Sequence, residues 1–392
     1  MHNPKQFWKS MNKILNKSNK NTTTQIRYNN NIIQEPSVAA NIFNQHFASI
    51  GNSPVFDSPV AYDSLNSSTC RSSFSLQKIL PVEVQHAINK LKDDCGTGPD
   101  GIETKFIKLA AHILMYPLCD LFNLSIATCT LPSTWKFAIV TPLHKGGDPR
   151  DTNNYRPISI INSLAKILEK LIFNQLSHYV NIFNILSPCQ SGFRPNFSTS
   201  TALLKFTNNV FSTSENGKLT GAIFLDLTKA FDIVDHYLLL DKLNSIGVTR
   251  NTLLWFNSYL HNKRQCVSFN GNLSNYLTVE KGVPQGSSLG PLLFSIFIND
   301  LPKICSDCQI YLYADDIVIY TANANRSSIE TSIQSEFALV QNWFTTNKLS
   351  LNKNKSCCML LGTRQGLGET PDLTISFNDG SSLERVSSFK YL

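Results

Sequence analysis

The chain has 392 residues, enough for two domains or for one large domain with an extension. Hydrophobic residues make up 42% of it, so a substantial core can form and wholesale disorder is excluded. The formal net charge of +7 permits a nucleic-acid partner without requiring one.

Targeting and membrane-spanning signals are not seen in the sequence. The first residues, Met1 to Gln6, begin no apolar run of signal-peptide length. No stretch approaches the roughly 18 uninterrupted apolar residues that a membrane span requires. We therefore expect a soluble protein that makes no membrane contact.

The ten cysteines are scattered along the chain, which favours free thiols in a reducing compartment over a disulfide framework. One pair, Cys305 and Cys308, has the spacing of metal ligands. A structural zinc ion would need two further ligands, and the nearest thiols in the sequence are Cys357 and Cys358. Ordinary thiols are the favoured interpretation, with zinc as the alternative.

The first 50 residues predict two helices separated by a polar break. In the first helix, lysines recur every four residues from Lys5 to Lys17 and share one face. This face is either solvated or in contact with phosphates. The Asn- and Thr-rich residues 16–31 form the break, and a helical pattern through residues 38–47 follows. Residues 52–75 are rich in Ser, Asn and Pro and predict a linker.

From Leu76 onward, helices and strands are interleaved irregularly. The pattern predicts helices over residues 82–91, 161–183 and 199–211, and strands over residues 137–141, 221–227, 265–270 and 276–279. Residues 310–320 predict a β-hairpin. This order is typical of the α+β class and not of regular βαβ units.

Three carboxylates stand where these predicted strands end. Asp226 follows an apolar strand, and Asp315 and Asp316 occupy the tight turn of the hairpin. Adjacent carboxylates repel one another, and hard divalent cations relieve that repulsion. Two such ions about 3.5–4 Å apart can clamp the attacking and leaving oxygens of a phosphoryl transfer. A solvated turn is the alternative for Asp315 and Asp316 taken alone.

The amino-acid sequence around these carboxylates resembles the palm motifs of reverse transcriptases, most closely those of jockey-type non-LTR retrotransposons. Three segments carry the resemblance in the family's order: 224–236 (FLDLTKAFDIVDH), 282–294 (GVPQGSSLGPLLF) with 298–301 (INDL), and 313–316 (YADD). Residues 98–102, 154–159 and 190–194 look like the upstream finger motifs, and residues 347–352 with Lys355 look like the fourth palm motif. The start of the chain, with Phe7, Trp8 and residues 41–44, resembles the connector that precedes the polymerase.

The resemblance implies a right-hand polymerase fold, with fingers and palm and a helical N-terminal extension. Residues 1–78 would form the extension with its linker, and residues 79–392 the reverse transcriptase domain, with a core from about 136. The chain would end before the thumb. The implied partners are an RNA template, a DNA primer and deoxynucleoside triphosphates, with two Mg²⁺ ions, or Mn²⁺, as cofactors. The element's life cycle implies action in the nucleus and cytoplasm, and the oligomeric state stays open.

The resemblance also assigns site residues. Asp226, Asp315 and Asp316 would be the catalytic, metal-binding carboxylates, joined by the backbone of Leu227. The residues that would bind the nucleotide are Lys145, Arg156, Phe231, Gln285, Gly286 and Lys355. Phe231 would exclude a 2′-hydroxyl, and Gln285 would donate a hydrogen bond to the nucleotide or to the template–primer minor groove. The alternatives are a core position for Phe231 and a solvated one for Lys145. His236 beside Asp235 is expected to be structural, because no activated serine accompanies it.

Other functions stay open beside an active RNA-directed DNA polymerase. Within the class, a group II intron-type reverse transcriptase shares the Tyr-Ala-Asp-Asp sequence. A nucleic-acid-binding remnant without catalysis would bind RNA in a salt-sensitive way. An unrelated metal-dependent phosphatase would turn over without a primer, and only the carboxylates support it.

Overall fold

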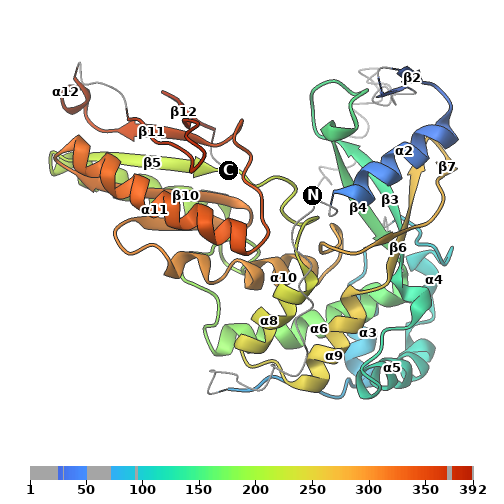
Figure 1. Cartoon of the computed structure of the whole chain (residues 1–392). Coiled ribbons are helices and arrows are strands. Elements are labelled where there is room, and N and C mark those ends of the chain that lie inside the picture. Colours follow the sequence, from blue (N-terminus) through green and yellow to red (C-terminus); the bar gives the residue numbers. More distant parts are fainter. Residues whose placement is uncertain (1–24, 30, 51–71, 93–95, 369–372, 391–392) are drawn as a thin grey trace, which may run out of the picture.

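The computed structural model describes residues 25–29, 31–50, 72–92, 96–368 and 373–390 (Figure 1). The strands are β1 (Ile26–Tyr28), β2 (Asn31–Ile33), β3 (Phe137–His144), β4 (Tyr155–Ile161), β5 (Leu219–Leu225), β6 (Lys263–Phe269), β7 (Asn272–Leu273), β8 (Leu277–Val279), β9 (Gln309–Tyr313), β10 (Asp316–Asn323), β11 (Cys357–Leu361) and β12 (Glu384–Arg385).

Helices cover more of the described residues than strands do. They are α2 (Pro36–Ser49), α3 (Pro81–Asn89), α4 (Thr104–Leu109), α5 (Ala111–Ala127), α6 (Ser163–Ile182), α7 (Thr199–Glu215), α8 (His236–Ser245), α9 (Arg250–Leu260), α10 (Gly290–Phe297), α11 (Arg326–Thr346) and α12 (Arg364–Leu367). Short 3₁₀ turns are η2 (Ser133–Lys136), η3 (Thr152–Asn154) and η4 (Leu301–Lys303). None of the helices described is long and apolar enough to cross a membrane.

The central sheet has the strand order β12-β11-β5-β10-β9. Successive side chains of each strand point to opposite faces of the sheet, and both faces are buried. Ile223 and Leu225 join the large core that includes α11, whereas Phe224 and Val318 join a smaller core beneath α7. A side chain at Gly221 would come within 2.3 Å of Ile329, so glycine lets α11 pack directly on β5.

A second sheet contains β4, β3, β6 and β7, with β8 paired to β6. Strand β3 pairs antiparallel with β4 and parallel with β6. Helix α2 lies over this sheet, and its Phe43 is fully buried against Tyr155 and Phe269. In Figure 1 the two sheets stand side by side above a layer of helices that includes α3, α5, α6 and α9.

The irregular order of helices and strands confirms the α+β class, and the predicted hairpin and the long helix after residue 161 are present. One difference lies in the predicted polar break, where β1 and β2 form an antiparallel hairpin. The sequence shows no alternation of apolar and polar residues there that would have predicted strands. Ile26, which is buried beside α2, anchors the hairpin. The predicted lysine-rich helix and most of the predicted linker lie outside the described residues, and the division at residue 78 stays a prediction.

Candidate active site

Most of the predicted site residues line one open pocket between the two sheets. They are Lys145, Arg156, Asp226, Leu227, Phe231, Gln285, Asp315 and Lys355. Asp316 and Gly286 lie just beyond this lining: Asp316 lines a neighbouring pocket that shares Asp226 and Lys355, and Gly286 packs against Ser159. Segments more than 200 residues apart in the sequence therefore meet at one place.

The register of the central sheet brings the carboxylates together. Ile317 pairs with Leu225, so Asp316 and Asp226 occupy the next opposite positions on two antiparallel strands. Alternation directs both toward the sheet face that carries Phe224 and Val318. Asp315 lies in the hairpin turn beside them. Burial, and then Asp315 and Asp226, raise the pKa of Asp316 to about 6. Burial raises the pKa of Asp315 as well, and the charge of Asp226 adds to this effect.

The turn that carries Asp315 has a strained backbone, and residues 190–192 support it. Ala314 has a φ of 56°, a left-handed conformation that is unfavourable for a residue with a side chain. The Gln190 side-chain oxygen accepts hydrogen bonds from the backbone N–H groups of Ala314 at 3.2 Å and of Gly192 at 2.7 Å. A Cβ on Gly192 would lie 2.2 Å from the Ala314 nitrogen, so only glycine permits this approach. The residues of the expected finger motif 190–194 thus brace the turn, a role that the sequence did not predict.

The loop after α11 fixes Asp226. The Asn352 side chain donates to Oδ2 of Asp226 at 3.0 Å, and the Lys355 ammonium group lies 3.6 Å from the same oxygen. The backbone N–H of Asp226 donates to the buried Ser356 hydroxyl at 3.2 Å. Lys355 therefore offsets part of the charge of Asp226 in this arrangement. Asn352 belongs to the segment that resembles the fourth palm motif but had no assigned role, and Ser356 lies outside that segment and is a site residue that the sequence did not predict.

The donor set at this end of the sheet suits a hard cation. Leu227 forms an antiparallel bridge with Leu351 whose two hydrogen bonds, both 2.8 Å, use the Thr228 N–H and the Asp226 carbonyl. The Leu227 carbonyl takes no part in that bridge. Carboxylate and carbonyl oxygens are the ligands that Mg²⁺ and Mn²⁺ prefer, so the residues fit such an ion chemically. Within the described ranges, no three Asp, Glu, His or Cys side chains already converge on one point as ligands.

Phe231 and Gln285 form one wall of the pocket. The Phe231 ring stacks on Phe294 with 4.5 Å between ring centroids, which fixes its position while leaving it partly exposed. The Gln285 side-chain nitrogen donates to both carboxylate oxygens of Asp232, at 2.8 and 2.9 Å. Because both N–H groups of this nitrogen are engaged, only the side-chain oxygen of Gln285 is left to contact a substrate. This oxygen accepts hydrogen bonds, whereas we expected Gln285 to donate one. Burial raises the pKa of Asp232 to about 6.

Two exposed cations stand at the mouth of the pocket. Lys145 follows β3, where its backbone N–H donates to Asn154 at 2.9 Å, and Arg156 lies on β4. Burial, and then the nearby charges of Lys355 and Arg156, lower the pKa of Lys145. An anion placed among these cations would relieve their repulsion.

Gly286 fixes the loop of Gln285 against the second sheet. It has a φ of 114°, and a Cβ there would lie 2.7 Å from the Ser159 carbonyl oxygen, so glycine is required for both reasons. The Ser159 N–H donates to the Gln285 carbonyl at 2.8 Å. The pocket wall is thereby tied to β4.

Two of the alternatives raised by the sequence are resolved by the structure. His236 begins α8, is buried, and bonds through Nε2 to the Gly282 carbonyl at 2.8 Å, which confirms a structural role. Cys308 precedes β9, whereas Cys357 and Cys358 lie on β11, three strand spacings or roughly 14 Å away across the sheet. A zinc site made from these thiols is therefore excluded, and burial raises the pKa of Cys308 to about 12.

Comparisons with known proteins agree with this geometry. The model of the family "Reverse transcriptase (RNA-dependent DNA polymerase)" matches residues 143–392. The RNA-directed DNA polymerase from mobile element jockey of Drosophila funebris is 28% identical over 367 residues, which cover 92% of this chain and 39% of that protein. The probable RNA-directed DNA polymerase from transposon BS of Drosophila melanogaster is 30% identical over 343 residues, which cover 81% of this chain and 36% of that protein. The chain spans about two fifths or less of the length of these relatives. It belongs to the reverse transcriptase family, on the branch of the non-LTR retrotransposons.

Proposed function

We propose that this chain forms the palm and fingers of an RNA-directed DNA polymerase, with the central sheet as palm and the second sheet as fingers. The observation that carries the proposal is the single pocket in which Asp226 and Asp315 meet Phe231, Gln285 and Arg156. A carboxylate cluster faces exposed cations across a space walled by an aromatic ring, which is what joining a nucleotide to a primer requires.

In this proposal Asp226, Asp315 and the Leu227 carbonyl hold two divalent cations, Mg²⁺ or Mn²⁺. When bound, these ions lower the pKa of the primer 3′-hydroxyl and offset the charge of the triphosphate. Asp316, opposite Asp226 in the sheet register, adjusts the charge of the site. Asn352 and Ser356 keep Asp226 oriented through their bonds of 3.0 and 3.2 Å.

The remaining residues bind the incoming deoxynucleotide. Arg156 and Lys145 contact the triphosphate, for which the planar fork of arginine is well suited. Phe231, fixed by its stacking on Phe294, lies under the sugar and leaves no room for a 2′-hydroxyl. Lys355, whose ammonium group lies 3.6 Å from Asp226, contacts the departing pyrophosphate in this proposal.

Primer extension on poly(rA)/oligo(dT) with dTTP tests this function. The proposal predicts extension that requires the primer and either Mg²⁺ or Mn²⁺, and that stops when the metal is chelated. Release of phosphate from dTTP without a primer would support a phosphatase instead. Salt-sensitive RNA binding with no extension under any metal would identify a remnant without catalysis.

A further inference from the structure

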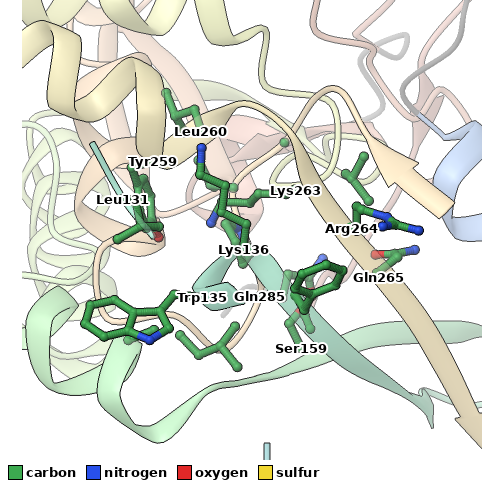
Figure 2. A pocket seen from close by; sticks show the side chains of 18 of the residues that line it. Leu131, Trp135, Lys136, Ser159, Tyr259, Leu260, Lys263, Arg264, Gln265 and Gln285 are labelled. Atoms are coloured by element: carbon green, nitrogen blue, oxygen red, sulfur yellow. The ribbon is translucent and has the colours of Figure 1, made fainter. Parts of the chain in front are cut away.

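A buried carboxylate lies behind the loop that carries Gln285. Glu169 belongs to α6, and only 4% of its surface is exposed. Together with Gln285 it lines a second cavity, enclosed by α6, α9 and this loop. Figure 2 shows Tyr259 and Lys263 close together in the cavity, and Gln285 at another part of its lining. The site described above assigns no role to Glu169.

Both carboxylate oxygens of Glu169 accept hydrogen bonds. Oε1 accepts from the Tyr259 hydroxyl at 2.8 Å, and Oε2 accepts from the Ser288 N–H at 3.0 Å. Tyr259 is itself buried: its ring stacks on Trp255, and the Lys263 ammonium group lies 3.8 Å from its centroid. Burial raises the pKa of Glu169, and the charge of Lys263 opposes that rise. A buried carboxylate is tolerated where such partners satisfy its oxygens, so this one joins α6 and α9 to the loop.

The partner of Glu169 in the loop stands next to the turn that presents Gln285. A backbone hydrogen bond of 3.2 Å, from the N–H of the last residue to the carbonyl of the first, closes this turn of residues 284–287. Its front is tied to β4 through Ser159, as described above, and Ser288 follows the turn at once. Glu169 therefore holds the turn from behind. Without this bond the Ser288 N–H would lose its acceptor, and a shift of the loop to recover one would move Gln285.

We propose that Glu169 is a positioning residue for the nucleotide site, and that it acts through Ser288 to hold Gln285 where its side-chain oxygen contacts the incoming nucleotide. The inference rests on the proposed function, because it requires a nucleotide in the pocket. Glu169 does not belong to the lining of the carboxylate pocket, so its effect must pass through the loop. A carboxylate with only a structural role would contribute to stability and leave nucleotide binding unchanged.

Substitutions of Glu169, assayed by steady-state addition of dTTP on poly(rA)/oligo(dT), test the proposal. Leucine fills a similar volume but removes both acceptors, so the KM for dTTP is expected to rise about fivefold, the scale of one lost hydrogen bond, with kcat little changed. Glutamine keeps one oxygen for the Ser288 N–H, and its N–H can donate to the Tyr259 hydroxyl oxygen. Glu169→Gln should therefore keep KM within about twofold of the wild type. Should Glu169→Leu not fold, the more adaptable Glu169→Met carries the same expectation.

Ser125→Ala is the matched control for the loss of a buried hydrogen bond. The Ser125 hydroxyl accepts from the Trp255 indole N–H at 3.1 Å, one contact away from Tyr259, but Ser125 lies outside the lining of the cavity. This substitution should lower the Tm as Glu169→Leu does and leave the KM for dTTP unchanged. In a Gln285→Ala background, Glu169→Leu should raise KM no further, because the group through which it acts is gone.

The outcomes separate this inference from the proposed function. A normal KM in Glu169→Leu, an equal rise in Ser125→Ala, or the same rise in the Gln285→Ala background would overturn the positioning role and leave the polymerase intact. Absence of nucleotide addition by the wild type would count against the polymerase instead. Binding of dTTP with Mg²⁺, followed by hydrogen exchange of residues 285–288, then decides the role of Glu169, because it needs no catalysis. Half-protection should require about fivefold more dTTP in Glu169→Leu than in the wild type or Ser125→Ala, and equal concentrations would overturn the role.

Discussion

The partly buried aspartates around the site differ in the groups that offset their charge. Asp226 is held by Asn352 and Lys355, whereas Asp316 receives no hydrogen bond from any side chain in the described ranges and has a raised pKa. Asp232, on the other side of Phe231, is compensated by the amide of Gln285. The three carboxylates thus differ in their partners: an amide and an ammonium group for Asp226, no side-chain hydrogen bond within the described residues for Asp316, and the Gln285 amide for Asp232.

Asp232→Asn is predicted to weaken nucleotide binding through Gln285. Asparagine keeps one oxygen that can accept from the Gln285 nitrogen and replaces the other by an N–H donor, so Gln285 loses one of its two hydrogen bonds and is held less firmly in the pocket wall. We expect the KM for dNTP to rise about fivefold, the scale of one lost hydrogen bond, with kcat little changed. Steady-state kinetics in a Gln285→Ala background provides the control, because Asp232→Asn should have no further effect there. Additive effects of the two substitutions would show that Asp232 acts independently.

At the scale of elements, the support of the hairpin turn by residues 190–192 determines where Asp315 lies. Gly192→Ala places a methyl group 2.2 Å from the Ala314 nitrogen, so the turn must move. A displacement of this kind is expected to reduce nucleotide addition about a hundredfold. Gly366→Ala serves as the control, since Gly366, like Gly192, has no positive φ and its added Cβ would come no closer than 3.2 Å to any atom. Full activity of Gly192→Ala in single-turnover assays would contradict this account of the turn.

The junction between α8 and the loop of Gln285 is predicted to be sensitive to acid. Burial lowers the pKa of His236 to about 4, so the folded state keeps it neutral while the unfolded chain takes up a proton near pH 6.5. Its stabilising contribution is present above pH 6.5 and is lost as the pH falls toward 4, by about 3 kcal/mol at most. Thermal unfolding should show a gap between wild type and His236→Gln that narrows from pH 7.5 to pH 5. The exposed His112→Gln should leave that pH dependence unchanged, and an equal gap at both pH values would contradict the prediction.

Strand ends and their acids could be predicted from the sequence, whereas contacts that depend on tertiary packing could not. Apolar runs ending in Asp226 and Asp315 place those carboxylates by local periodicity. The bond between Asp232 and Gln285 joins residues 53 positions apart, and no local pattern encodes it. The same holds for Gln190, whose bond to Ala314 spans 124 positions. Asn41 and Asn44 belong to the segment that resembles the connector before the polymerase. Their hydrogen bonds to the backbone of Asn275, at 3.0 and 2.7 Å, depend on α2 lying on the second sheet and could not be predicted from that segment.

At the scale of the whole molecule, the two sheets have separate cores, and α2 belongs to the second. Phe43→Ala is expected to cost about 3–5 kcal/mol, because the ring is fully buried against Tyr155 and Phe269. Hydrogen exchange should accelerate in β3, β4 and β6 more than in β5 and β10. Val38→Ala, at an exposed position of the same helix, should change little. Equal acceleration in both sheets would show that the cores unfold as one unit.

The most direct test of the central claim compares single-nucleotide addition by the wild type, Asp315→Ala and Asp307→Ala. Both aspartates belong to the β9–β10 hairpin region, but Asp307 is exposed at the end away from the turn. The account predicts a loss of about a thousandfold or more for Asp315→Ala and normal addition for Asp307→Ala, with both variants folded. Equal rates for Asp315→Ala and the wild type would contradict the claim that these carboxylates perform the chemistry.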